Sequence, residues 1–101
     1  MKWTLVRYRT KPDRADENQR LSAAVFDDLA ARKPAGLRYA VFRLPDDTFV
    51  HVAALEEGGT PLSTFESFKA FQKDIRERCA EGPLPMEPQL VGNYGMLTDR
   101  N

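Results

Sequence analysis

The stretch that decides the fold is a hairpin in the middle of the chain. Residues 37–55 have the sequence LRYAVFRLPDDTFVHVAAL, in which two runs rich in β-branched and aromatic residues flank a short polar connection. Pro45, Asp46 and Asp47 form that connection, and residues of these types favour tight turns. The pattern predicts two antiparallel strands, 37–44 and 48–55, joined by a turn.

A strand and a helix are predicted before the hairpin. Residues 3–9 are rich in types that favour strands, and the stretch stops just before Pro12. Over residues 13–33 apolar side chains recur every four positions, as they do on one face of a helix, until Pro34 ends the pattern.

A second helix and a last strand are predicted after the hairpin. Ser63 and Glu66 have the spacing of a capping box, which marks the start of a helix. The helix would bury one apolar stripe, formed by Phe65, Phe68, Phe71, Ile75 and Cys79. Gly82 follows its end, three prolines keep the next segment extended, and residues 90–97 predict the final strand.

The element order βαββαβ predicts an α+β, ferredoxin-like fold over residues 1–101 as a single domain. Right-handed crossovers place both helices on one face of a four-stranded antiparallel sheet. With a three-residue turn in the hairpin, one face carries only apolar residues and suits the helices: Ala40, Phe42, Leu44, Val50, Val52 and Ala54. A two-residue turn would reverse the parity of one strand.

The opposite, uncovered face would then carry Tyr39, Val41, Arg43, Phe49, His51, Ala53 and Leu55. An apolar surface of this size usually marks an interface or a ligand groove. We therefore expect the protein to pair with a second copy of itself through this face.

Composition limits the other partners. Fifteen basic residues balance fifteen acidic ones, so no overall charge attracts nucleic acid. No apolar run approaches the roughly 20 residues of a membrane helix, and the first residues lack the apolar stretch of a signal peptide. We expect a cytoplasmic protein. A single Cys and a single His exclude an internal disulfide and a multi-histidine or thiolate metal cluster.

Two stretches carry a family resemblance. Residues 6–12, VRYRTKP, lead into the long first helix, and residues 65–71, FESFKAF, open the second. Together with the element order they resemble the dimeric α/β-barrel superfamily, and within it the antibiotic-biosynthesis-monooxygenase type. The resemblance implies two sheets facing each other across a dimer, with a small pocket in each protomer. It also implies functions that range from cofactor-independent oxygenases to haem-degrading enzymes and proteins without known activity.

His51 is the candidate catalytic residue, because its ordinary pKa of about 6.5 suits it to take a proton from a phenol or quinol. Its alternative role is that of a hydrogen-bonded interface residue. Trp3, Tyr39 and Phe49 are candidates to line a pocket for a flat aromatic ligand, with Arg7 or Arg43 holding its oxyanion. These aromatic residues could equally be ordinary strand packing.

Asn93 lies between Gly92 and Gly95, where it could hydrogen-bond a ligand or simply accompany a bend. Cys79 is expected to be a core residue. The predicted second helix contains no histidine to hold haem, and Gly58-Gly59 lacks the context of a phosphate-binding loop. We therefore expect no cofactor. Two hypotheses remain: a cofactor-independent monooxygenase acting on a small aromatic phenol or quinol, and a non-catalytic dimer that binds a small ligand.

Overall fold

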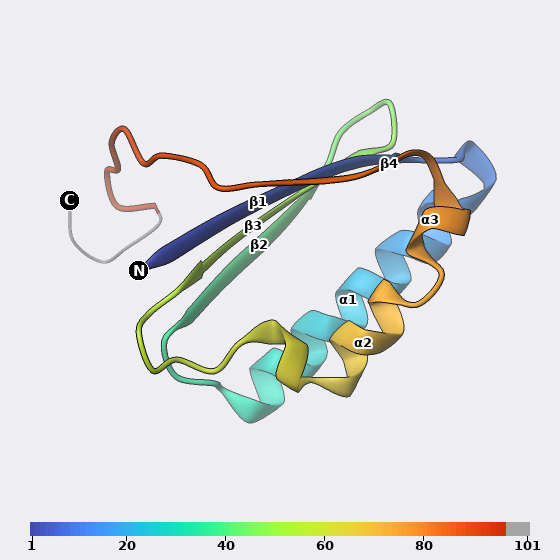
Figure 1. The fold of residues 1–101 in the computed structure, drawn as a ribbon. Coiled ribbons are helices and arrows are strands. Elements are labelled where there is room, and N and C mark those ends of the chain that lie inside the picture. Colours follow the sequence, from blue (N-terminus) through green and yellow to red (C-terminus); the bar gives the residue numbers. More distant parts are fainter. Residues whose placement is uncertain (97–101) are drawn as a thin grey trace.

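The predicted element order is confirmed. The computed structural model describes residues 1–96 and contains one four-stranded antiparallel sheet in the order β2-β3-β1-β4. The strands are β1 (Lys2–Thr10), β2 (Leu37–Arg43), β3 (Thr48–Leu55) and β4 (Cys79–Met86). The helices α1 (Ala15–Arg32), α2 (Glu66–Gln72) and α3 (Ile75–Arg78) cover one face of the sheet (Figure 1). Within residues 1–96, no helix combines the length and the apolar character needed to cross a membrane.

The hairpin has the predicted three-residue turn. Phe42 lies opposite Val50, and Ala40 lies opposite Val52, so these residues share one face of the sheet. The amide of Leu44 donates to the carbonyl of Thr48 at 2.8 Å and closes the turn. The division of the hairpin into two faces was therefore predicted correctly.

The assignment of those faces was wrong. Tyr39 and His51 lie on the helix side, where they line a cavity, whereas the side chain of Phe42 is 48% exposed on the uncovered side. The polar members of the inner face have partners there: His51 bonds two tyrosine hydroxyls, and Arg43 reaches Asp16 on α1. A mixed face can be buried when each polar group is paired in this way.

The second predicted helix is interrupted. It begins at Glu66 after a 3-10 turn over Leu62–Thr64, and no side chain caps it, so the predicted capping box of Ser63 does not form. Asp74 then adopts a left-handed conformation, with φ of 59°, and separates α2 from α3. The predicted stripe is nevertheless turned toward the core, because Phe71 and Cys79 are buried and Ile75 packs against them.

Arg78 explains where α2 ends. Its side chain is 2% exposed. Its guanidinium donates to the carbonyl of Phe71 at 2.6 Å and to that of Lys73 at 2.9 Å. The last carbonyls of a helix have no partner within the helix, and an arginine can supply one. The buried guanidinium therefore satisfies the backbone at the break.

The last strand was predicted too far along the chain. β4 starts at Cys79 and pairs with β1, while residues 90–96 form no strand and Leu97 lies outside the described residues. Pro83 and Pro85 lie within β4. They are tolerated because β4 is an edge strand, whose outer side needs no hydrogen bonds to a neighbour.

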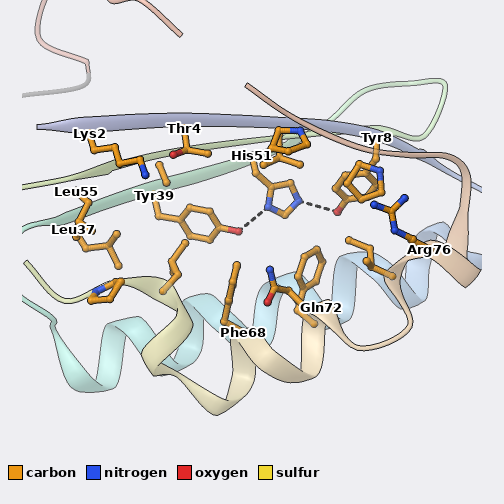
Figure 2. Close-up of a pocket in the computed structure, with 18 residues that line it drawn as sticks. Lys2, Thr4, Tyr8, Leu37, Tyr39, His51, Leu55, Phe68, Gln72 and Arg76 are labelled. Atoms are coloured by element: carbon orange, nitrogen blue, oxygen red, sulfur yellow. Dashed lines mark hydrogen bonds between the residues drawn. The ribbon is translucent and has the colours of Figure 1, made fainter. Parts of the chain in front are cut away.

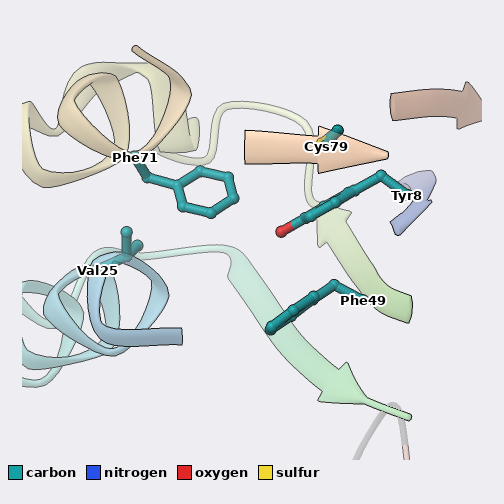
Figure 3. Packing of buried hydrophobic residues seen from close by; sticks show 5 residues of the cluster. All are labelled: Tyr8, Val25, Phe49, Phe71 and Cys79. Atoms are coloured by element: carbon teal, nitrogen blue, oxygen red, sulfur yellow. The ribbon is translucent and has the colours of Figure 1, made fainter. Parts of the chain in front are cut away.

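The core lies at one end of the space between sheet and helices. Tyr8 of β1 and Phe49 of β3 stack with ring centroids 5.6 Å apart, and Val25, Phe71 and Cys79 pack around them (Figure 3). The rest of the space between the two layers holds a cavity.

Candidate functional site

The cavity has a volume of about 610 Å³ and lies between the inner face of the sheet and the segment from Pro61 to Arg76 (Figure 2). All four strands contribute to it. Most of its wall is apolar, formed among others by Val6, Leu37, Leu55, Leu62, Phe68 and Ile75. A largely apolar cavity with a few polar groups is the usual form of a small-molecule site.

His51 lies at the centre of this cavity, with a tyrosine on each side (Figure 2). Its Nε2 is 2.8 Å from the hydroxyl of Tyr8, and its Nδ1 is 2.6 Å from the hydroxyl of Tyr39. Strand pairing produces this arrangement, because His51 lies opposite Val41 on β2, two residues from Tyr39, and opposite Val6 on β1, two residues from Tyr8. Side chains two residues apart in a strand share a face.

The hydrogen bonds continue from Tyr8 into the protein. Asn18 of α1 is fully buried, and its Nδ2 donates to the hydroxyl of Tyr8 at 2.8 Å. The Oδ1 of Asn18 accepts from Nε of Arg78 at 3.0 Å. Five side chains therefore form one buried chain, which runs in the order Arg78, Asn18, Tyr8, His51 and Tyr39.

Arg78 gives this chain a direction. A guanidinium only donates hydrogen bonds, so Asn18 must turn its oxygen to Arg78 and its NH₂ group to Tyr8. Because the oxygen of Tyr8 accepts from Asn18, its hydrogen is free to donate to Nε2 of His51. Were Tyr8 to accept from both sides, its buried hydrogen would lack a partner, at a cost of roughly 1–3 kcal/mol.

The direction fixes which nitrogen of His51 carries the hydrogen. With Nε2 accepting from Tyr8, a neutral imidazole carries its hydrogen on Nδ1 and donates it to the hydroxyl oxygen of Tyr39. The hydroxyl hydrogen of Tyr39 then has no acceptor among the described residues. Tyr39 therefore offers a hydrogen-bond donor to whatever occupies the cavity.

Burial keeps the three central groups neutral. It lowers the pKa of His51 to about 4, because the imidazolium would lose its solvation. Burial also raises the pKa of Tyr8 and that of Tyr39 well above the ordinary value for a phenol. At neutral pH the site consequently contains a neutral imidazole between two neutral hydroxyls.

The candidate residues predicted from the sequence are not all brought together. Tyr39 and His51 line the cavity, whereas Phe49 is buried in the core beside Tyr8. Trp3 and Arg7 alternate with the cavity-lining residues of β1, so they point to the uncovered side of the sheet.

The other two candidates lie elsewhere. Arg43 is held at the edge of the sheet by Asp16 and Asp47, so its guanidinium is already paired. Asn93 lies beyond β4, where its side chain accepts from the amide of Met96 at 3.2 Å.

Asn18 and Arg78 were missed by the sequence analysis. Asn18 lies on the inner face of α1, three residues after buried Ala15 and four residues before buried Ser22. A polar residue on an apolar helical stripe is a usable signal, because it must find a partner there. Arg78 gave no such signal. In the predicted continuous helix it does not belong to the apolar stripe, so nothing in the sequence indicates that its side chain is buried.

The described residues form no cluster of side chains that could bind a metal ion. No group of three or more His, Cys, Asp or Glu side chains within residues 1–96 is placed to hold one. Cys79 is buried, and burial raises the pKa of its thiol, which suits a core residue rather than a ligand or nucleophile.

The buried His51 makes the stability of the protein depend on pH. Its pKa is about 4 in the folded protein and about 6.5 when unfolded, so the unfolded state binds the proton more tightly. We expect this group to remove roughly 3 kcal/mol from the free energy of unfolding as pH falls from 7 to 4. Urea unfolding at several pH values, compared with His51→Gln, measures it. Parallel pH profiles for the two proteins would contradict the assignment.

No model of a known protein family matches this sequence, and no curated protein does. Solved structures share its fold. One antibiotic biosynthesis monooxygenase matches with a TM-score of 0.69 and 15% identity, over 91% of this chain and 100% of that chain. A candidate antibiotic biosynthesis monooxygenase from Nitrosomonas europaea matches with a TM-score of 0.69 and 14% identity, over 88% of each chain.

The Rv0793 protein from Mycobacterium tuberculosis matches with a TM-score of 0.70 and 11% identity, over 90% of this chain and 95% of that chain. At identities this low, the matches show a shared fold and do not show a shared reaction. The chain has the α+β fold of the antibiotic biosynthesis monooxygenase structures.

Proposed function

We propose that this chain is a cofactor-independent monooxygenase that acts on a small aromatic phenol or quinol bound in the cavity. The observation that carries the proposal is the hydroxyl of Tyr39, a directed hydrogen-bond donor within a largely apolar cavity. The names of the structural neighbours support the reaction class. The apolar walls support a flat aromatic substrate.

In the proposed reaction Tyr39 stabilises the substrate as its oxyanion. A hydrogen bond to an anion is stronger than one to a neutral group, so the donor favours ionisation of the substrate's phenol. The phenol proton passes to solvent water, and a proton is taken up again when the peroxide forms. His51 is a positioning residue in this proposal, since both its nitrogens are engaged by the hydroxyls of Tyr8 and Tyr39. The low pKa of His51 also makes it a poor base for a phenol.

The ionised substrate supplies the electrons. Its electron-rich ring carbon adds to O₂ and forms a carbon–oxygen bond. The resulting peroxide then loses water to give a carbonyl, so that anthrone and O₂ become anthraquinone and water. All four electrons that reduce O₂ come from the substrate. The task of the protein is to bind, ionise and orient it.

Tyr39→Phe tests this proposal. The variant keeps the ring, which stacks on Phe26 at 5.0 Å between centroids, and removes only the hydroxyl. We expect the rate of oxygen uptake with anthrone or 1-naphthol to fall roughly 10- to 100-fold, the effect of losing a hydrogen bond to a charged group. Tyr94→Phe is the matched control, because Tyr94 is 89% exposed and lies outside the cavity.

Three results would count against the proposal. Equal oxygen uptake by the Tyr39→Phe and Tyr94→Phe variants would remove the Tyr39 hydroxyl from the reaction. Equal oxygen uptake by wild type and the His51→Ala variant would show that the buried hydrogen-bond chain does not contribute to the reaction. If none of the substrates is consumed faster than without protein, the monooxygenase proposal falls.

The alternative proposal is a non-catalytic protein that binds a small aromatic ligand. It is favoured by the pKa values at the centre of the site, because neither His51 nor Tyr39 titrates near neutral pH. Saturable binding of naphthols that depends on Tyr39, without oxygen uptake, would support the binder over the enzyme.

We further propose that two copies pair through the uncovered face of the sheet. Strand register places a set of apolar side chains there: Trp3, Leu5, Phe42, Val50, Val52, Leu84 and Met86. Leu84 is 63% exposed and Met86 is 46% exposed, and the segment that follows exposes Val91 and Met96 as well. Large apolar areas of this kind are usually covered by a partner.

Phe42→Glu tests the pairing. Phe42 is 48% exposed in one chain, so a charge there should leave the monomer folded but oppose burial against a second sheet. We expect light scattering after size exclusion to give the mass of two chains for wild type and of one chain for the variant. Ala70→Glu adds the same charge on the exposed side of α2 and should remain a dimer. A monomeric wild type at micromolar concentration would refute the pairing.

A further inference from the structure

The charged residues around the cavity have one sign. Lys2 and Arg76 line it, toward opposite ends in Figure 2, and its described lining contains no Asp or Glu. Charges of one sign beside low-dielectric walls raise the local concentration of the opposite ion. Although the whole chain is neutral, its cavity therefore favours an anion.

Arg76 is the better placed of the two cations. It belongs to α3, and its guanidinium lies against β4 at Gly82, where a Cβ atom would be 3.0 Å from Nη1. The backbone of Gly82 does not require glycine, since its φ lies outside the left-handed region. The missing side chain instead leaves room for the guanidinium. Among residues 1–96, no carboxylate forms an ion pair with Arg76.

Lys2 is in a different position. It also lines a second groove, together with the acidic residues Glu56, Glu57 and Glu87. These carboxylates offset its charge in part. Arg76 lines the cavity but not the second groove, and the described lining of the cavity contains no carboxylate. Its guanidinium also has the planar fork that matches a carboxylate.

We infer that Arg76 binds a carboxylate on the ligand, so that the ligand is an aromatic acid with its phenol at Tyr39 and its carboxylate at the other end of the cavity. This inference rests on the proposed function, because it takes the cavity to hold a phenol. It adds a second polar contact and a defined ligand class. The apolar side chains of Phe68, Phe71 and Ile75, which line the cavity from the helix side, pack against the ring.

Calorimetry with three probes tests the inference. The first two, 6-hydroxy-2-naphthoate and 6-hydroxy-2-naphthamide, have nearly the same shape and differ in charge. The third, 2-naphthol, lacks the carboxyl group altogether. At neutral pH and low salt we expect the wild type to bind the naphthoate about tenfold more tightly than the amide, as for a charge-assisted hydrogen bond.

Variants assign this preference to Arg76. Arg76→Gln should bind the naphthoate and the amide equally and keep its affinity for 2-naphthol, whereas Arg76→Lys should retain part of the preference. Arg20→Gln removes the same charge from the exposed side of α1, outside the cavity, and should behave as wild type. Gly82→Ala should weaken the preference by displacing the flexible end of Arg76 while leaving the fold intact.

The outcomes separate the two proposals. Equal binding of the naphthoate and the amide by wild type, or a preference that survives in Arg76→Gln, overturns the inference and leaves the phenol site standing if 2-naphthol binds in a Tyr39-dependent way. If no probe binds, both the inference and the proposed function fail.

Discussion

The buried guanidinium of Arg78 is the interaction on which the rest of this structure depends. A guanidinium accepts no hydrogen bonds, so each hydrogen-bond partner of Arg78 must be an acceptor. Two of these are carbonyls at the end of α2, and the third belongs to Asn18 on α1. One side chain therefore terminates a helix, joins it to α1, and allows the chain to turn into β4 at the next residue. An unpaired cation here would be very costly, which is why the three acceptors are fixed.

The same constraint reaches the cavity. With the amide of Asn18 oriented by Arg78, the hydroxyl of Tyr8 and the imidazole of His51 each have one favourable orientation. The direction is set by a permanent donor at one end and not by any group that titrates near neutral pH. Such a site is preorganised, because it does not have to reorient when charge develops on a ligand. The direction of the hydrogen bond that Tyr39 offers to the cavity is set by Arg78, with three side chains between the two residues.

The sequence predicts the fold well where local chemistry decides it. The hairpin, the first strand and the long first helix follow from residue type and periodicity. The hairpin also placed His51 and Tyr39 correctly on one shared face, although that face was predicted to be the uncovered one. The sequence fails where a distant contact overrides a local pattern. The stripe from Phe65 to Cys79 continues at helical spacing, but Arg78 ends the helix from the core side. The inner face was misassigned for a related reason: pairing of His51 with two tyrosines makes a polar face suitable for burial, and such pairing is visible only in three dimensions.

The turn at residues 45–47 determines which side chains of β3 face the cavity and which face the uncovered side of the sheet. Along β3, His51 points into the cavity while its neighbours Val50 and Val52 point to the uncovered face. A shift of one residue in the pairing of β2 and β3 would exchange these sets, exposing His51 and burying valines in its place. Asp46 opposes such a shift by accepting from the amide of Thr48 at 3.0 Å, and Asp47 supplies the left-handed residue, with φ of 64°, that a three-residue turn requires. The two aspartates therefore act on the cavity without touching it, because they fix the register that places His51 between its tyrosines.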